Sequence, residues 1–149
     1  MFIETDLESV LAHLNKLTPE TTPEWGKMSA QRMVEHLTDT IRIATGEAPQ
    51  ELIIPEDKIE RMVAFLYSDK PMARNIEVPF AKADTPLRNE ELELAVDEFV
   101  EAYLEFQELF AANPDLKTVH AFYGPLNYEQ WDLLNKKHLT HHFTQFGIL

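Results

Sequence analysis

A long apolar stripe at helical spacing, within residues 89–112, restricts the fold more than any other feature of this sequence. Its apolar side chains recur at alternating steps of four and three residues, and Asp and Glu occupy the opposite face. The stripe consists of Leu92, Val96, Phe99, Tyr103, Phe106 and Phe110. This pattern predicts a helix over about 89–112 with one face buried in a core.

Four further helices are predicted, over about 7–16, 30–44, 56–67 and 127–143. Ser29 is a candidate N-cap, and Asn127 with Gln130 forms a candidate capping box. Residues 68–87 contain three prolines and are expected to form a long crossover, with a short alternating stretch at 76–80. We therefore expect an all-α fold, a four-helix bundle with a long crossover plus a short extra helix.

Length and charge narrow the class of protein. The 149 residues suit a single domain over 1–149. With 13 basic and 26 acidic residues, a net charge of −13 argues against a nucleic-acid partner and against an anionic membrane surface. No apolar run approaches the roughly 20 residues needed to span a bilayer, and the acidic start of the chain is unlike a secretory signal. The expectation is a cytoplasmic protein acting on a small-molecule substrate.

The absence of cysteine restricts the chemistry. It excludes disulfides, thiolate zinc sites, protein-ligated iron–sulfur clusters and a cysteine nucleophile. Reactive groups must then come from histidines, carboxylates or a bound small molecule. Of the six histidines, three fall within five residues in the segment KKHLTHHFTQFG.

His138 and His142 are spaced i and i+4, so on a helix they lie on the same face about one turn apart. Two such imidazoles can converge on one cation at the 2.0–2.1 Å that zinc requires. His141 points elsewhere. The spacing alone is weakly specific, since chance supplies such a pair in roughly one comparable chain in four or five. A solvated helix end is the alternative interpretation.

The helix predicted over 30–44 offers a third ligand, because His36 is expected on its inward face. Three inward histidines from two helices would form a three-histidine site with an open position, although a histidine such as His36, taken alone, is more often an ordinary core or surface residue than a ligand. Glu35 and Asp39 could orient an imidazole or supply a further ligand, or could be exposed acids. His120 could approach from the loop before the last helix, or brace that loop by a hydrogen bond.

Two stretches resemble the DinB/YfiT-like superfamily of metalloenzymes: WGKMSAQRMVEHLTD and HAFYGPLNYEQWDLLNKKHLTHHFTQFG. They match a branch with a W-G-K-M opening and a K-H-x-x-H-H-x-x-Q-F-G close, and together cover under a third of the chain. The resemblance implies an up-down-down-up four-helix bundle that holds one metal on three histidines. Those ligands correspond here to His36, His138 and His142, with Gln145 at the H-x-x-Q position.

The resemblance also implies a function, a metal-dependent enzyme. A divalent metal, zinc or nickel, would activate water in a hydrolase or a low-molecular-weight thiol in a transferase. Glu35, Asp39 and His120 are then candidate proton carriers. The alternative is a non-catalytic metal-binding or stress-response bundle whose metal is structural or absent. A third interpretation is a dimerisation module, since members of the superfamily often form homodimers.

Overall fold

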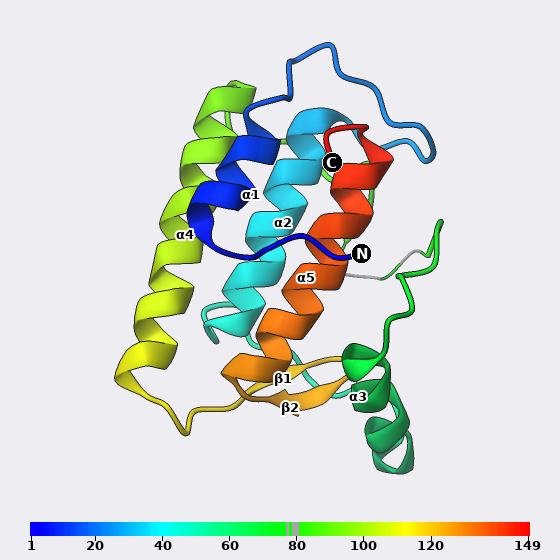
Figure 1. Cartoon of the computed structure of the whole chain (residues 1–149), viewed down its shortest axis with the longest axis vertical. Coiled ribbons are helices and arrows are strands. Elements are labelled where there is room, and N and C mark those ends of the chain that lie inside the picture. Colours follow the sequence, from blue (N-terminus) through cyan, green and yellow to red (C-terminus); the bar gives the residue numbers. More distant parts are fainter. Residues whose placement is uncertain (77, 79–80) are drawn as a thin grey trace.

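The computed structural model describes residues 1–76, 78 and 81–149 and is mostly helical (Figure 1). The shorter elements are the α-helices α1 (Leu7–Leu14) and α3 (Ile59–Tyr67), the 3-10 turn η1 (Glu56–Lys58), and the strands β1 (Thr118–His120) and β2 (Gly124–Leu126). The three long helices are α2 (Ala30–Ala44), α4 (Leu92–Ala112) and α5 (Tyr128–Gln145).

Local capping sets the start of two helices, as the sequence predicts. The Ser29 side chain accepts from the backbone N–H of Arg32 at the start of α2. At the start of α5, Asn127 and Gln130 form the reciprocal capping box, with hydrogen bonds of 2.9 and 3.0 Å. The boundaries differ by a few residues elsewhere: α1 ends at Leu14, α4 begins at Leu92 and α5 continues to Gln145.

The expectation of an all-α chain needs correction, because a small antiparallel hairpin joins α4 to α5. β1 and β2 pair with His120 opposite Gly124. Strands of three residues carry too little pattern to be recognised in a sequence. Gly124 has φ +76°, and a Cβ there would lie 3.1 Å from Ile59 Cδ1, so the turn is shaped by its contact with α3. Residues 77, 79 and 80, within the alternating stretch at 76–80, lie outside the described residues.

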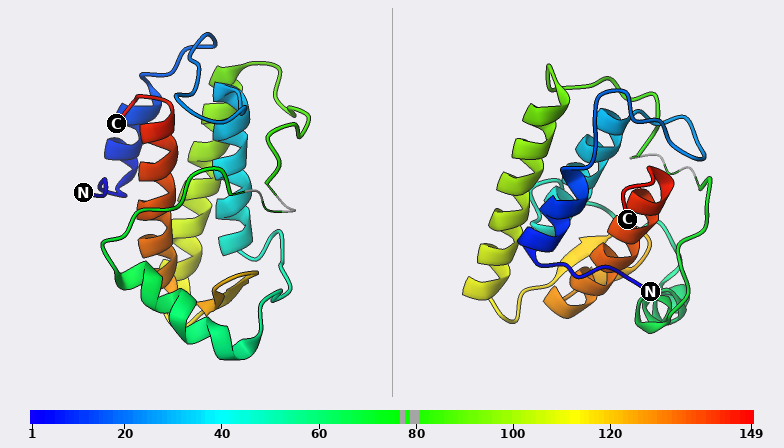
Figure 2. Two further views of the ribbon diagram at one scale, coloured as in Figure 1. Left: turned by 90° about the vertical axis from the view of Figure 1, so that its right-hand side faces the viewer. Right: turned by 45° about the horizontal axis from the view of Figure 1, so that its top comes forward.

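Helices α1, α2, α4 and α5 lie side by side, with the hairpin across one end (Figure 1) and α3 outside α5 (Figure 2). The apolar stripe of α4 lies in the core: five of its six predicted residues are buried and Val96 is partly buried. Thr118 fixes the hairpin to the bundle, because its Oγ1 donates to Ala44 O (2.7 Å) and accepts from Trp131 Nε1 (2.8 Å).

The N-terminal segment is bound to α5. Ile3 N donates to Thr140 Oγ1 (3.0 Å), and Thr5 Oγ1 donates to Asp132 (2.6 Å). These contacts fix the N-terminal segment along α5. In the described part of the chain, no helix combines the length and the apolar character that crossing a membrane requires.

Candidate metal centre

Three histidines from two helices converge on one point. His36 comes from α2, and His138 and His142 come from successive turns of α5. Nε2 of His138 lies 2.8 Å from Nε2 of His36 and 3.1 Å from Nε2 of His142. Two nitrogens bound to one metal at 2.0–2.1 Å lie about 2.8 to 3.4 Å apart for angles between octahedral and tetrahedral. The spacing therefore fits a shared cation.

Burial keeps these imidazoles in the form that binds metal. Loss of solvation lowers the pKa of His142 to about 4, and it lowers the pKa of His36 and of His138 well below the usual histidine range. The neighbouring rings lower the last two further, because each added proton would repel the next. Near neutral pH, all three rings are therefore neutral and carry a lone pair available to a cation.

The orientation of His142 is set by a chain of hydrogen bonds. Gln145 Nε2 donates to the carbonyl oxygen of Trp25 (2.9 Å), which turns its Oε1 toward the imidazole. Nδ1 of His142 then donates to that oxygen (2.7 Å). With the proton held on Nδ1, the Nε2 lone pair of His142 faces the centre of the cluster. A hydrogen bond to the distal nitrogen is the usual support for a metal-binding histidine.

Without a cation, the cluster cannot satisfy its own nitrogens. Nε2 of His142 can only accept. Nε2 of His138 carries at most one proton, which it can donate either to His142 or to His36, so the other of its two nitrogen contacts has no good donor. In addition, the buried Nδ1 of His36 has no hydrogen-bond partner among the described residues. No carboxylate in the described part of the chain joins the group. The donor set thus fits a divalent metal with three nitrogen ligands.

The cluster opens onto a cavity of about 1390 Å³. Helix α3 supplies one wall through Met62 and Phe65, and residues of the crossover supply another. Trp25, at the W-G-K-M motif, borders it together with His141, whose ring meets the indole edge-on at 5.6 Å. The histidine nitrogens therefore face a space large enough for a small molecule.

His120 also lines this cavity, at the end of β1. Its Nδ1 accepts from the backbone N–H of Phe122 (3.0 Å), which leaves Nε2 as the site of the proton in the neutral ring. Burial lowers the pKa of His120 to about 4. His120 therefore forms a hydrogen bond within its own turn and also borders the same cavity as the histidine cluster.

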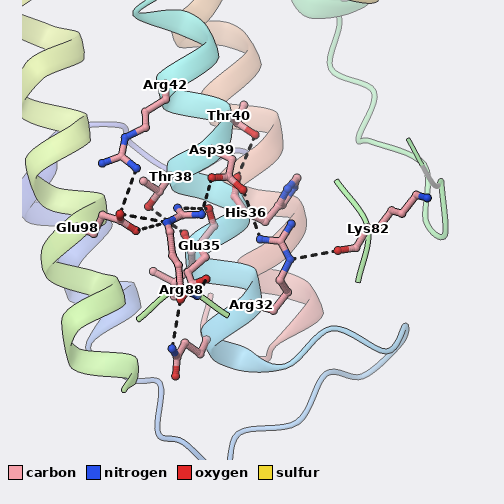
Figure 3. Close-up of polar contacts among 12 residues, drawn as sticks. Arg32, Glu35, His36, Thr38, Asp39, Thr40, Arg42, Lys82, Arg88 and Glu98 are labelled. Atoms are coloured by element: carbon pink, nitrogen blue, oxygen red, sulfur yellow. Dashed lines mark hydrogen bonds and ion pairs between the residues drawn. The ribbon is translucent and has the colours of Figure 1, made fainter. Parts of the chain in front are cut away.

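The structure does not bring Glu35 and Asp39 to the cavity. Both lie beside Arg88 instead (Figure 3). The Glu35 carboxylate is fully buried and accepts from the backbone N–H groups of Arg88 (3.0 Å) and Asn89 (3.1 Å). Burial alone would raise the pKa of Glu35, but these hydrogen bonds outweigh it and lower the pKa. Asp39 forms ion pairs with Arg32 (3.4 Å) and Arg88 (2.9 Å). Both acids belong to the contact between α2 and the segment before α4.

Sequence reasoning missed Lys137, which is 1% exposed although it lies beside His138. Its Nζ donates to the carbonyl oxygens of Ser68 (2.9 Å) and Lys70 and lies 4.4 Å from the ring centre of Phe65. These contacts fix the start of the crossover against α5 and so hold one wall of the cavity. A lysine in a helix is normally solvated, so its place at the start of the K-H-x-x-H-H-x-x-Q-F-G motif does not by itself predict burial.

Fold and site together define a mostly helical protein with a candidate three-histidine metal centre beside a large cavity. The chain belongs to the family described as "Protein of unknown function (DUF1569)", whose sequence profile matches residues 3–147. Comparison with curated proteins and with solved structures gives no match.

Proposed function

We propose that this protein is a metal-dependent enzyme of the DinB/YfiT-like type. His36, His138 and His142 would hold one divalent metal, zinc or nickel. One observation carries the proposal: three neutral imidazoles direct their Nε2 atoms at a common point on the surface of a cavity. Neutral imidazole is the common histidine ligand for such ions.

Two observations support the relation to that superfamily. Figure 1 shows α1 and α5 running in one direction and α2 and α4 in the other, which is the up-down-down-up order. The two sequence motifs also meet in space, since Gln145 of the H-x-x-Q position contacts the Trp25 carbonyl of the W-G-K-M motif. Both motifs would then serve one site.

A bound divalent metal would act as a Lewis acid and lower the pKa of a water or of a low-molecular-weight thiol, giving a hydrolase or a transferase. The chain's own residues would provide the surroundings. Gln145 fixes the proton of His142 on Nδ1, and His120 borders the same cavity as the three ligands. The apolar walls reduce the access of bulk water.

An enzyme agrees better with this site than a non-catalytic bundle does. A structural metal centre is usually closed by a fourth protein ligand. Here the described residues supply three nitrogens and no carboxylate, and the cavity lies next to them. A substrate or water could therefore reach the remaining position.

Elemental analysis of the untagged protein tests the metal. We expect about one zinc or nickel per chain in the wild type and none in the His138→Ala/His142→Ala variant. A matched control, His13→Ala/His141→Ala, also removes two histidines but leaves the three ligands in place, and it should retain the metal. A wild type that binds neither ion after reconstitution near neutral pH would contradict the proposal, and so would a His138→Ala/His142→Ala variant that keeps its metal.

A further inference from the structure

The charge around the cavity is opposite to that of the whole chain. The protein has 26 acidic and 13 basic residues. Nevertheless, the described residues that line the cavity include no aspartate or glutamate, whereas Lys27, Arg61 and Lys70 are among them. Glu77 lies outside the described residues. The described residues around a ligand in this cavity therefore carry positive charge, whereas the chain as a whole is strongly negative.

These three basic residues lie at the solvent side of the cavity, because each is exposed, while the ligand histidines His36 and His142 are buried. None of the three forms an ion pair with a described residue, unlike Arg32, Arg42 and Arg88 near α4. Three unpaired cations at the mouth of one cavity attract anions, and the low-dielectric walls strengthen their field.

The cavity has a largely apolar lining. It is bordered by Met28, Met62, Phe65, Met72, Phe122 and Leu134. Its volume of about 1390 Å³ exceeds the usual range of about 300–1000 Å³ for small-molecule sites. An apolar body could fill this space while a charged group stays at the mouth. Methionines are common in cavities that accept apolar ligands of varied shape.

We propose that this cavity binds organic anions with a bulky apolar body, and that the positive field of Lys27, Arg61 and Lys70 on its rim favours their anionic group. As a statement about the substrate class of the enzyme, this inference rests on the proposed function. Binding itself needs no metal, so the two can be tested separately.

The test is calorimetric titration of the metal-free, chelator-treated protein at pH 8, where the histidines of the cavity are neutral. Three probes share one apolar body and differ in charge: 4-phenylbutyrate, 4-phenylbutan-1-ol and 4-phenylbutylammonium. The carboxylate should bind most tightly and the ammonium most weakly. In the Lys27→Gln/Arg61→Gln/Lys70→Gln variant, affinity for 4-phenylbutyrate should fall about fivefold, because each exposed charge contributes a few tenths of a kcal/mol.

The matched control is Lys58→Gln/Lys117→Gln/Lys136→Gln, which changes the net charge equally at residues that do not line the cavity. It should weaken 4-phenylbutyrate less than twofold. Equal affinity for the three probes, an equal loss in the control, or no binding of any probe at millimolar concentration would overturn the inference. If the protein fails to bind zinc or nickel, the proposed function is wrong, but this titration of the metal-free protein still tests the anion site. If the protein binds metal but does not bind 4-phenylbutyrate, the anion site is wrong and the proposed metal centre is unaffected.

Discussion

Helix α2 carries two polar regions that differ in how their charges are balanced. On one face, His36 meets two further histidines, and all three groups are bases. Toward α4, acids and arginines alternate: Arg88 contacts Asp39 and Glu98 at 2.9 Å, and Arg42 contacts Glu98 at 3.1 Å (Figure 3). The ligand histidines His36 and His142 are buried, whereas the ion-pair region is partly exposed to solvent.

The difference separates a region that is complete from one that needs a ligand. In the ion-pair region each charged group has a partner of opposite sign. Even Arg42 Nε, which has no hydrogen-bond partner among the described residues, lies 3.2 Å from Glu47 Oε2. The histidine cluster contains nitrogens directed at one another and one unpartnered Nδ1. Burial without a partner costs free energy, so the presence of such a cluster beside a cavity indicates a role in binding. Four predictions test this contrast, in order of decreasing effect.

Glu35→Ala should give the largest loss of stability. It removes the acceptor for the backbone N–H groups of Arg88 and Asn89 within a buried region, which should lower the free energy of unfolding by about 4 kcal/mol. Urea unfolding of the metal-free protein measures this. Glu101→Ala, at an exposed position of α4, is the control and should change stability by less than about 0.5 kcal/mol. A loss below 1 kcal/mol for Glu35→Ala would show that the region does not hold α2 against α4.

Acid should destabilise the metal-free protein through His120. Its pKa is about 4 in the folded state against 6.5 in the unfolded state, so the unfolded state binds the proton more tightly. The stability is fully present above pH 6.5 and is lost as the pH falls toward 4, by up to about 3 kcal/mol. Urea unfolding at pH 7 and pH 4 measures this loss, which should be smaller by that amount in His120→Gln. Parallel losses in the two proteins would contradict the assignment.

Gln145→Leu should weaken metal binding while leaving the three ligands in place. Without the acceptor for Nδ1 of His142, the ring proton is no longer held on Nδ1 and can move to Nε2, where it blocks the lone pair that would bind the metal. Zinc affinity should therefore fall about 10- to 100-fold. Competition with a chromophoric chelator measures the affinity. Gln145→Glu retains an acceptor and should bind more tightly than Gln145→Leu. Equal affinities in the wild type and both variants would show that the hydrogen bond has no effect on the site.

Asp39→Asn should have the smallest effect. Asp39 is about one-third exposed and its ion pairs are partly screened by solvent, so the free energy of unfolding should change by less than about 1 kcal/mol. Zinc affinity should be unchanged within about twofold, because Asp39 does not line the cavity. A tenfold drop in zinc affinity would show that the two regions of α2 are coupled and that Asp39 contributes to the metal centre.

Local patterns in the sequence predict most of the helical framework and the choice of three histidines. The caps at Ser29 and Asn127 act over three residues, and the i, i+4 spacing of His138 and His142 fixes their shared face within one helix. Such features need no knowledge of the distant chain. For this reason the start of α2 and of α5 agrees with the sequence prediction within a residue.

The remaining features depend on contacts between distant segments. Glu35 and His36 are neighbours in sequence, but successive residues on a helix are about 100° apart, so one faces the segment before α4 and the other faces the cavity. The hairpin is held by Thr118 through Ala44 and Trp131 rather than by its own strand pattern. The walls of the cavity likewise require α3 and the crossover to be placed against α5.

The long separation between the histidines gives the candidate centre a second consequence. His36 and His138 are 102 residues apart in the chain, and the protein has no cysteine with which to form a disulfide. A metal bound to both would act as a reversible cross-link that closes a loop of this length. In the chain-entropy description, such a closure raises the free energy of unfolding by roughly 4–5 kcal/mol. Loss of the metal would then shorten the lifetime of the folded protein as well as remove the site.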